Sequence, residues 1–250
     1  MKITVGKNVD EMGSLAAELA AGKMLRAIAE KGSARIVLST GESQFAVIKH
    51  LVTKELPWDK VIMFHLDEYV GIPETHAASF RKYLKERFID LVHPKKAFFV
   101  CGEGDIQSNI TTLTNEIREA PIDLALIGIG ENAHIAFNDP PANFAASEAY
   151  IIVNLDDTCK KQQVGEGWFA GIGDVPNQAI SMTVHQIMLS DTIISCVPGK
   201  RKAQAIRDTL SAPSVTNMIP ATKLREHKDW HLFLDKESAS LTDQQKLQNA

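Results

Sequence analysis

The sequence predicts an α/β fold with one doubly wound, mostly parallel sheet and helices on both of its faces. Short apolar segments typical of buried strands alternate along the chain with amphipathic helical segments. Several of these strands end in turns of glycine and small polar residues that lead into a helix. No internal repeat, low-complexity block or linker interrupts the 250 residues. We therefore expect a single domain over residues 1–250, with a loosely ordered polar tail from 236 to 250.

The composition is that of a soluble globular protein. Hydrophobic residues make up 44% of the chain and charged residues 23%, which is ordinary for a soluble globular protein. The net charge of −4, without any basic tract, argues against nucleic acid as a partner. No apolar run approaches the ~18 residues of a membrane-spanning helix, and the N-terminus lacks the apolar core of a signal peptide. Three widely spaced cysteines fit a reducing cytoplasm. No spacing of His, Cys and Asp resembles a metal site, so we expect a cytoplasmic protein without a metal or other cofactor.

The first elements follow from hydrophobic periodicity. Residues 3–5 form a short apolar strand. From 9 to 30, apolar residues recur at the 3.6-residue spacing of an amphipathic helix, which a Lys-Gly-Ser sequence ends. Residues 34–38 form a second strand, and a helical segment follows from 44 to 56.

The turn between this strand and helix is a candidate anion site. It contains Ser39, Thr40, Gly41 and Ser43. Backbone N–H groups and the helix dipole at such a turn point toward a ligand, and hydroxyl groups add donors. A capping turn without a ligand is the alternative, and Glu42 would repel an anion if its side chain pointed inward.

The third strand, residues 61–66, ends at two adjacent carboxylates, Asp67 and Glu68. In open α/β sheets, ligands bind beyond the carboxyl ends of the strands. Neighbouring residues in a strand point to opposite sides, so we expect at most one of the two carboxylates to face a site. A solvated acidic turn is the alternative.

The strand over residues 122–127 leads into the densest group of polar residues in the chain. Before it we expect a helix at 79–92, a strand at 97–100 and a helix at 105–119. After Gly128 and Gly130, five polar side chains follow within nine positions, namely Glu131, Asn132, His134, Asn138 and Asp139. An imidazole near carboxylate and amide groups can transfer protons near neutral pH. A helix-capping turn is the alternative, although a turn needs only one or two such residues.

The remaining elements are a strand at 148–153, a polar helix within 155–168, an extended segment at 179–184 and strands at 192–197 and 230–234. The strand at 192–197 ends in Pro-Gly-Lys-Arg-Lys at the start of a helix that reaches residue 210. Lysines at such a junction can hold a phosphate as point charges, and ordinary surface lysines are the alternative.

Three stretches of the chain resemble one family, the glucosamine-6-phosphate deaminases. Residues 64–71, Phe-His-Leu-Asp-Glu-Tyr-Val-Gly, resemble the family's F-x-x-D-E-Y-V-G strand end. Residues 128–140 are similar to its G-x-G-x-[DN]-G-H-I-x-F-N-E-P signature, and residues 39–41 to its [PS]-T-G phosphate turn. The order and spacing of the three stretches also match, so the resemblance covers nearly the whole chain.

The resemblance implies a modified Rossmann-like fold and an aldose–ketose isomerisation coupled to deamination. An amino-sugar 6-phosphate would open, isomerise and lose ammonia to give fructose 6-phosphate. Asp67 would move the proton between C2 and C1, and His134 would exchange a proton with the ring oxygen. Asn132 and Asp139 would orient and tune His134. The positions implied for binding the phosphosugar are Ser39, Thr40, Gly41, Ser43, Glu68 and Lys202.

The chain also departs from the family pattern. Glu42 stands beside the phosphate turn where a small residue is usual, and Ala133 replaces the glycine before the histidine. Asp139 replaces a glutamate and is one methylene shorter, which predicts a weaker or water-mediated contact with His134. Residues 160–169 do not clearly supply the arginine that many members place on the phosphate. These departures leave open whether the hexosamine is glucosamine or galactosamine 6-phosphate, and the oligomeric state, including a homo-oligomer, is also open.

Other functions remain as alternatives. A 6-phosphogluconolactonase of the same superfamily would hydrolyse a lactone and need no base at C2. A sugar-phosphate-binding protein that has lost catalysis would fit the changes at Glu42 and Asp139. A sugar-phosphate-sensing regulator ranks below both, because no basic helix-turn-helix precedes residue 34.

Overall fold

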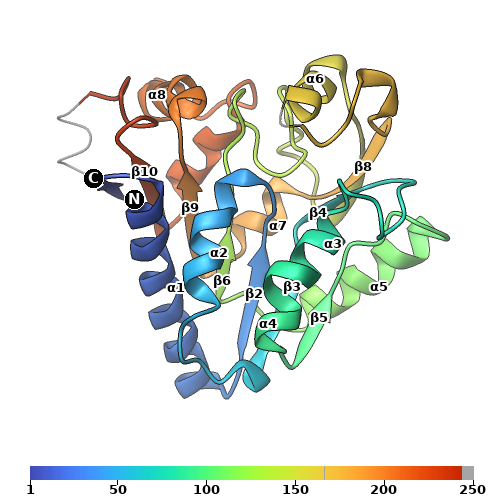
Figure 1. Ribbon diagram of the computed structural model, residues 1–250, viewed down its shortest axis with the longest axis vertical. Coiled ribbons are helices and arrows are strands. Elements are labelled where there is room, and N and C mark those ends of the chain that lie inside the picture. Colours follow the sequence, from blue (N-terminus) through green and yellow to red (C-terminus); the bar gives the residue numbers. More distant parts are fainter. Residues whose placement is uncertain (166, 244–250) are drawn as a thin grey trace.

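A seven-stranded sheet forms the centre of the molecule (Figure 1). The structure is a computed structural model, and it describes residues 1–165 and 167–243. The strand order is β1-β10-β9-β6-β2-β3-β5, and every neighbouring pair is parallel. The strands are β1 (Lys2–Gly6), β2 (Ala34–Leu38), β3 (Val61–His65), β5 (Lys96–Phe98), β6 (Leu124–Leu126), β9 (Thr192–Val197) and β10 (Trp230–Asp235). All residues of β2, β9 and β10 are buried, as expected for parallel strands covered on both faces.

Helices cover both faces of this sheet. They are α1 (Val9–Lys31), α2 (Phe45–Leu51), α3 (Phe80–Leu84), α4 (Asp90–Val92), α5 (Ile106–Arg118), α6 (Asp157–Gly165), α7 (Val184–Met188) and α8 (Ala203–Ser211). A π-helical turn, Lys85–Ile89, joins α3 to α4. The predicted doubly wound, mostly parallel α/β fold is therefore confirmed.

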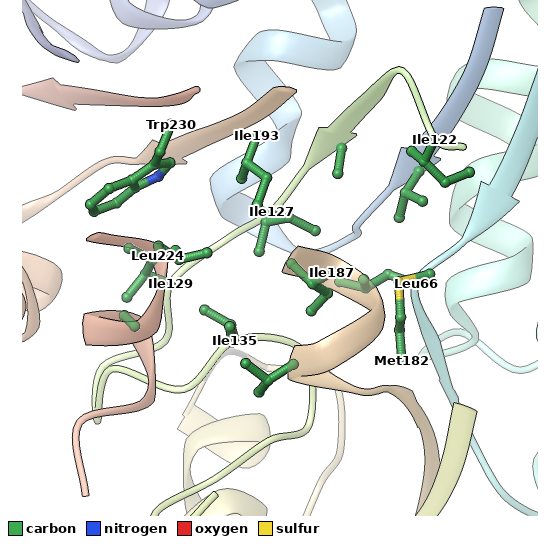
Figure 2. Close-up of a cluster of buried hydrophobic side chains, with 14 of the residues drawn as sticks. Leu66, Ile122, Ile127, Ile129, Ile135, Met182, Ile187, Ile193, Leu224 and Trp230 are labelled. Carbon is green, nitrogen blue, oxygen red and sulfur yellow. The ribbon is translucent and has the colours of Figure 1, made fainter. Parts of the chain in front are cut away.

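Alternate side chains of the strands pack into two separate hydrophobic cores, one on each face of the sheet. Ile36 and Leu38 of β2 pack in one cluster with residues of α1, α2 and α3. Val37, between them, packs in the other cluster with residues of α5, α7 and α8. Figure 2 shows part of this second cluster, where Ile127 and Ile187 lie among its buried side chains. The two-residue period of a strand thus assigns each side chain to one face of the sheet.

A second, three-stranded sheet is attached beside the first. It contains β4 (Asp67–Tyr69), β8 (Gln178–Met182) and β7 (Tyr150–Asn154), and both of its pairs are antiparallel. The chain passes from the large sheet into the small one at Leu66, directly between β3 and β4. The sequence indicated the segments of β7 and β8, but it gave residues 67–69 only as the end of the preceding strand and did not predict the separate pairing.

Several boundaries differ from the prediction. The helix expected over 44–56 ends at Leu51, because the Thr53 hydroxyl and backbone N–H both bond to the His50 carbonyl. The helix expected within 155–168 covers Asp157–Gly165. The helix expected over 79–92 is confirmed as α3, the π-helical turn and α4, with Ser79 as its N-cap.

The C-terminal segment folds back onto β10 as far as the structure describes it. The backbone N–H of Ser238 donates to Asp235 Oδ1 at 2.8 Å, and Ala239 is buried. The rest of the tail predicted to be loosely ordered, residues 244–250, lies outside the described residues. Across the ranges 1–165 and 167–243, no helix combines the length and the apolar character that crossing a membrane requires.

Candidate active site

A cavity of about 900 Å³ lies at the carboxyl-terminal edge of the large sheet. Its walls include the segments that follow β2, β3, β6 and β9, together with part of α6. In Figure 1 this edge lies toward α6 and α8. The predicted site residues that line the cavity are Ser39, Thr40, Gly41, Ser43, Asp67, His134 and Lys202. The fold therefore brings a carboxylate, an imidazole and a hydroxyl-rich turn to one place from distant parts of the chain.

The turn after β2 is shaped by Gly41 and by the short 3-10 helix that leads into α2. Gly41 has a φ of 94°, a left-handed conformation that glycine adopts without strain. The backbone N–H of Gln44 donates to the Gly41 carbonyl at 3.0 Å and closes the turn. The hydroxyl of Ser39 is buried and has no hydrogen-bond partner among the residues that the structure describes. Such a hydroxyl, in a residue of the cavity wall, is a group that a ligand can satisfy.

Asp67 lies at the junction of the two sheets, as the first residue of β4. It lines the cavity but is only 6% exposed. Burial, and after it the neighbouring Glu68 carboxylate, raise the pKa of Asp67 to about 8. A carboxyl group with a pKa near the working pH can both accept and return a proton.

Glu68 points away from the cavity and is fully buried. Its carboxylate accepts hydrogen bonds from the Ser79 hydroxyl at 2.9 Å, from the Arg81 backbone N–H at 2.9 Å and from the Arg81 Nε at 3.3 Å. It also accepts from the backbone N–H groups of Tyr69 and Phe80. The structure thus does not bring Glu68 to the substrate-binding position implied by the motif, because this side chain caps the start of α3 instead. At most one of the two carboxylates was expected to face the site, and that one is Asp67.

The loop after β6 holds His134 against a carboxylate. Nδ1 of His134 lies 3.0 Å from Oδ1 of Asp139. The side-chain amide of Asn132 donates to the same Oδ1 at 2.8 Å, and Asn132 Oδ1 accepts from the His134 backbone N–H at 3.1 Å. Asn132 and Asp139 do not line the cavity but lie behind the imidazole. With Nδ1 turned toward Asp139, Nε2 is the ring nitrogen available to a ligand.

Asp139 stays charged in this arrangement. Burial acts to raise its pKa, but contacts with His134, Asn132 and Cys159 outweigh burial and hold the pKa below its ordinary value. Of the weaker or water-mediated contact that the shorter aspartate predicted, the 3.0 Å distance rules out the need for a bridging water. The loop itself brings the two residues close enough.

Gly130 makes room for the imidazole. A Cβ atom at this position would lie only 2.2 Å from Cε1 of His134. The loop is closed by the Gly130 backbone N–H, which donates to the His134 carbonyl at 2.9 Å. Farther along, the side-chain amide of Asn138 donates to the Met182 carbonyl at 2.9 Å and fastens the loop to β8. These contacts explain why a glycine and an asparagine occupy these positions.

The turn after β9 supplies cations to the cavity wall. Lys202 lines the cavity, as the motif implied, together with Lys200 and Arg201. Arg201 is a residue that the sequence did not single out. Its Nη2 lies 3.2 Å from Glu42 Oε2 and its Nε lies 3.5 Å from Glu131 Oε1. These partners are far away in the sequence, so no local signal indicated the contact.

The region of α6 contributes further wall residues that the sequence did not indicate. Gln162, Gln163 and Trp168 line the cavity. The hydroxyl of Tyr69 donates to Gln163 Oε1 at 2.5 Å. The indole N–H of Trp168 is buried and lacks a hydrogen-bond partner within the described part of the chain. A polar, weakly periodic segment carries no sequence signal for such a position.

Within residues 1–165 and 167–243, no group of three or more His, Cys, Asp or Glu residues is placed to hold a metal ion.

Comparisons with known proteins place this arrangement in context. The sequence model of a family described as glucosamine-6-phosphate isomerases/6-phosphogluconolactonase matches residues 7–233. The glucosamine-6-phosphate deaminase of Streptococcus equi subsp. equi (strain 4047) is 33% identical over 221 residues, which are 88% of this chain and 92% of that protein. The glucosamine-6-phosphate deaminase of Thermoanaerobacter sp. (strain X514) is 31% identical over 249 residues, 96% of this chain and 95% of that protein.

Solved structures show the same likeness. A monomeric glucosamine-6-phosphate deaminase matches with a TM-score of 0.86 and 27% sequence identity, covering 96% of this chain and 100% of its own. A putative 6-phosphogluconolactonase from Neisseria gonorrhoeae FA 1090 matches with a TM-score of 0.74 and 18% identity, covering 94% and 99%. At that lower identity the likeness shows the fold alone.

Proposed function

The chain belongs to the family of glucosamine-6-phosphate isomerases and 6-phosphogluconolactonases, and on this premise we propose that it isomerises and deaminates a hexosamine 6-phosphate. The products are a ketohexose 6-phosphate and ammonia, and one water molecule is consumed. The observation that carries the proposal is the single cavity onto which Asp67, His134 and the β2–α2 turn all face. The deaminase relatives at 31–33% identity support this reaction over lactone hydrolysis.

The anionic end of the substrate is assigned to the turn after β2. Ser39, Thr40 and Ser43 supply hydroxyl groups, and the turn presents backbone N–H groups at the start of a helical segment. Lys202 adds a positive charge from the facing turn. A phosphate held there fixes the sugar at a distance from its reacting carbons, which lowers the entropy cost of reaching the reactive geometry.

His134 is assigned to ring opening. The sugar ring opens when its oxygen gains a proton as the hydroxyl at C1 loses one. Nε2 of His134 can exchange that proton, because the Asp139 carboxylate lies 3.0 Å from Nδ1 and stabilises the imidazole when it is positively charged. Asn132 is assigned a positioning role, since its side chain contacts both Asp139 and the His134 backbone.

Asp67 is assigned to the isomerisation. In the open-chain aldehyde, the carboxylate removes the proton from C2, the ammonium group of the substrate gives a proton to the oxygen at C1, and an enolamine forms between C1 and C2. The same proton returns to C1, which leaves an iminium at C2, and water then adds at C2 and displaces ammonia. The raised pKa of Asp67, about 8, suits a group that first takes and then gives back a proton.

The direct test is ammonia release from glucosamine 6-phosphate and from galactosamine 6-phosphate. We expect the wild-type protein to release ammonia from one of the two, and Asp67→Asn to lose at least about 1,000-fold in kcat, in line with removal of an essential proton-transfer group. Circular dichroism of Asp67→Asn checks that the variant is folded. The absence of ammonia from both sugars with folded wild-type protein would exclude the proposed reaction.

The same variant, Asp67→Asn, distinguishes a lactonase from a deaminase. Hydrolysis of 6-phosphogluconolactone needs no base at C2, so a lactonase would keep most of its activity in Asp67→Asn. A protein that only binds phosphosugars would show heat of binding in calorimetry but no turnover of either substrate class.

Further assignments accompany the reaction. Because the step that releases ammonia breaks a C–N bond with water, we describe the enzyme as a hydrolase as well as an isomerase. We propose a cytoplasmic location, because Cys101, Cys159 and Cys196 form no disulfide, as is usual in a reducing compartment. We also propose that residues 1–250 act as one domain and that a homo-oligomer is not needed to complete the cavity.

A further inference from the structure

The turn assigned to the phosphate carries a carboxylate of its own. Glu42 follows Gly41 directly, begins the short 3-10 helix and lines the cavity. A second negative charge next to a phosphate dianion opposes binding unless a cation lies between them or beside them. The proposed function therefore requires a partner for Glu42.

Arg201 is placed to be that partner. It stands on the turn after β9 and reaches Glu42, on the turn after β2, at 3.2 Å. Its Nε lies 3.5 Å from Glu131, on the loop after β6. One guanidinium thus connects the three loops that surround the anionic end of the cavity. A planar guanidinium can do this because its Nε and Nη2 face different partners at the same time.

Two other cations of the cavity wall have partners other than Glu42. Lys49 donates to Asp10 at 2.9 Å. Arg87 stacks over the rings of Phe45 and Tyr83, at 4.9 and 5.5 Å. Among the contacts found in residues 1–165 and 167–243, Arg201 is the cation paired with Glu42.

We propose that Arg201 is a positioning residue that neutralises Glu42, so that the β2–α2 turn accepts a phosphate monoester, and that Glu131 holds Arg201 in place. The proposal rests on the proposed function and deepens it by naming the charge balance of the phosphate subsite. In this arrangement Arg201 acts through Glu42 rather than by carrying out the reaction. Phosphate affinity therefore depends on Arg201 only while Glu42 is charged.

A double-mutant cycle tests this coupling. Binding of fructose 6-phosphate is measured by calorimetry for the wild type, Arg201→Ala, Glu42→Gln and the double variant. We expect Arg201→Ala to weaken binding about tenfold or more, and Glu42→Gln to bind at least as tightly as the wild type. In the Glu42→Gln background, removal of Arg201 should cost less than about threefold. Arg207→Ala is the matched control, because it removes another exposed arginine, on α8 and outside the cavity.

Salt dependence and the conservative variant Arg201→Lys show whether the loss of affinity is electrostatic or comes from a damaged fold. The loss in Arg201→Ala should shrink as sodium chloride rises from 0.02 to 0.5 M, because exposed charges are screened at high ionic strength. Arg201→Lys should recover part of the affinity. With turnover as the readout, Arg201→Ala should raise KM and leave kcat within about twofold.

The outcomes are distinguishable from failure of the proposed function. If Arg201→Ala binds fructose 6-phosphate like Arg207→Ala, or if it loses as much affinity in the Glu42→Gln background as in the wild type, the inference is overturned. It is also overturned if the wild-type protein binds no fructose 6-phosphate. If the wild type binds the phosphosugar and shows the expected coupling but releases no ammonia, the reaction assignment fails and the charge assignment stands.

Discussion

At the scale of single residues, two adjacent carboxylates have different surroundings. Glu68 is enclosed by N–H and O–H donors at the start of α3. Asp67 faces the cavity and carries a pKa raised to about 8, first by burial and then by the charge of Glu68. Glu68 therefore stabilises the start of α3, and Asp67 is available for proton transfer in the cavity.

The pKa of Asp67 predicts the pH dependence of the reaction. As a base, Asp67 works only when ionised, so kcat/KM should rise about tenfold per pH unit below pH 8 and level off above it. The measurement is kcat/KM for the hexosamine 6-phosphate between pH 6 and 9.5. A profile that is flat from pH 6 to 9 would contradict the assignment of Asp67 as the base with this pKa.

The same group makes stability depend on pH, and the sign follows from linkage. Between pH 4 and 8 the folded protein keeps a proton on Asp67 that the unfolded chain has released. The contribution of this group to the free energy of unfolding is therefore largest below pH 4 and falls as pH rises to about 8. Asp67→Asn cannot ionise, so its stability relative to wild type should increase from pH 5 to 8, by up to ~1.4 kcal/mol per unit. Urea unfolding of both proteins at the two pH values provides the comparison.

Local sequence predicted these residues better than it predicted their partners. The alternation of a strand indicated that one carboxylate at most would face the site, but not which one. That choice depends on β4 pairing with β8, more than a hundred residues later. The pairing of Glu42 with Arg201 spans 159 positions and leaves no trace in either local segment.

At the scale of elements, the start of α3 is held by side chains rather than by helix propensity. The Ser79 hydroxyl donates to Glu68, and the Ser79 oxygen accepts from the Lys82 backbone N–H. With only five residues, α3 continues into a π-helical turn and would not persist alone. Its position therefore depends on the strand end that carries Asp67 and Glu68.

Ser79→Ala tests this dependence. The variant loses the N-cap and leaves the buried Glu68 carboxylate with one donor fewer, so the free energy of unfolding should fall by about 1–2 kcal/mol. Ser108→Ala, at an exposed position in the first turn of α5, is the matched control and should change stability by less than ~0.5 kcal/mol. Urea unfolding measures both. Equal stabilities for the two variants would show that Ser79 does not support α3.

The elements that were predicted well have strong local signals. The long helix was predicted over 9–30 and observed as Val9–Lys31, with Asn8 as N-cap and Gly32 in the left-handed conformation at its end. The separate antiparallel sheet was not foreseen, because its three short strands pair over long sequence distances and their own residues do not specify a partner. The end of α2 was not predicted, because it is set by a hydrogen bond from the Thr53 hydroxyl to the His50 carbonyl.

At the scale of the whole molecule, the cavity is assembled from loops that meet only in the folded chain. A phosphosugar that binds there stabilises the native state alone. At 100 times its Kd, fructose 6-phosphate should add about 2.7 kcal/mol to the free energy of unfolding and raise Tm by roughly 5–11 °C. Thermal unfolding with and without ligand measures the shift. Fructose at the same concentration is the control, and an equal shift with fructose would show that the phosphate is not recognised.

The backbone of Leu66 forms hydrogen bonds with strands of both sheets. Its N–H donates to the Leu38 carbonyl at 3.1 Å, and its carbonyl accepts from the Met182 N–H at 3.0 Å. Asp67 is the next residue, so its placement is fixed by the scaffold, whereas the residues of α6 that also line the cavity belong to neither sheet. Over evolutionary time, substitutions in α6 can therefore change which sugars the descendants of this fold bind, while the proton-carrying carboxylate stays in place.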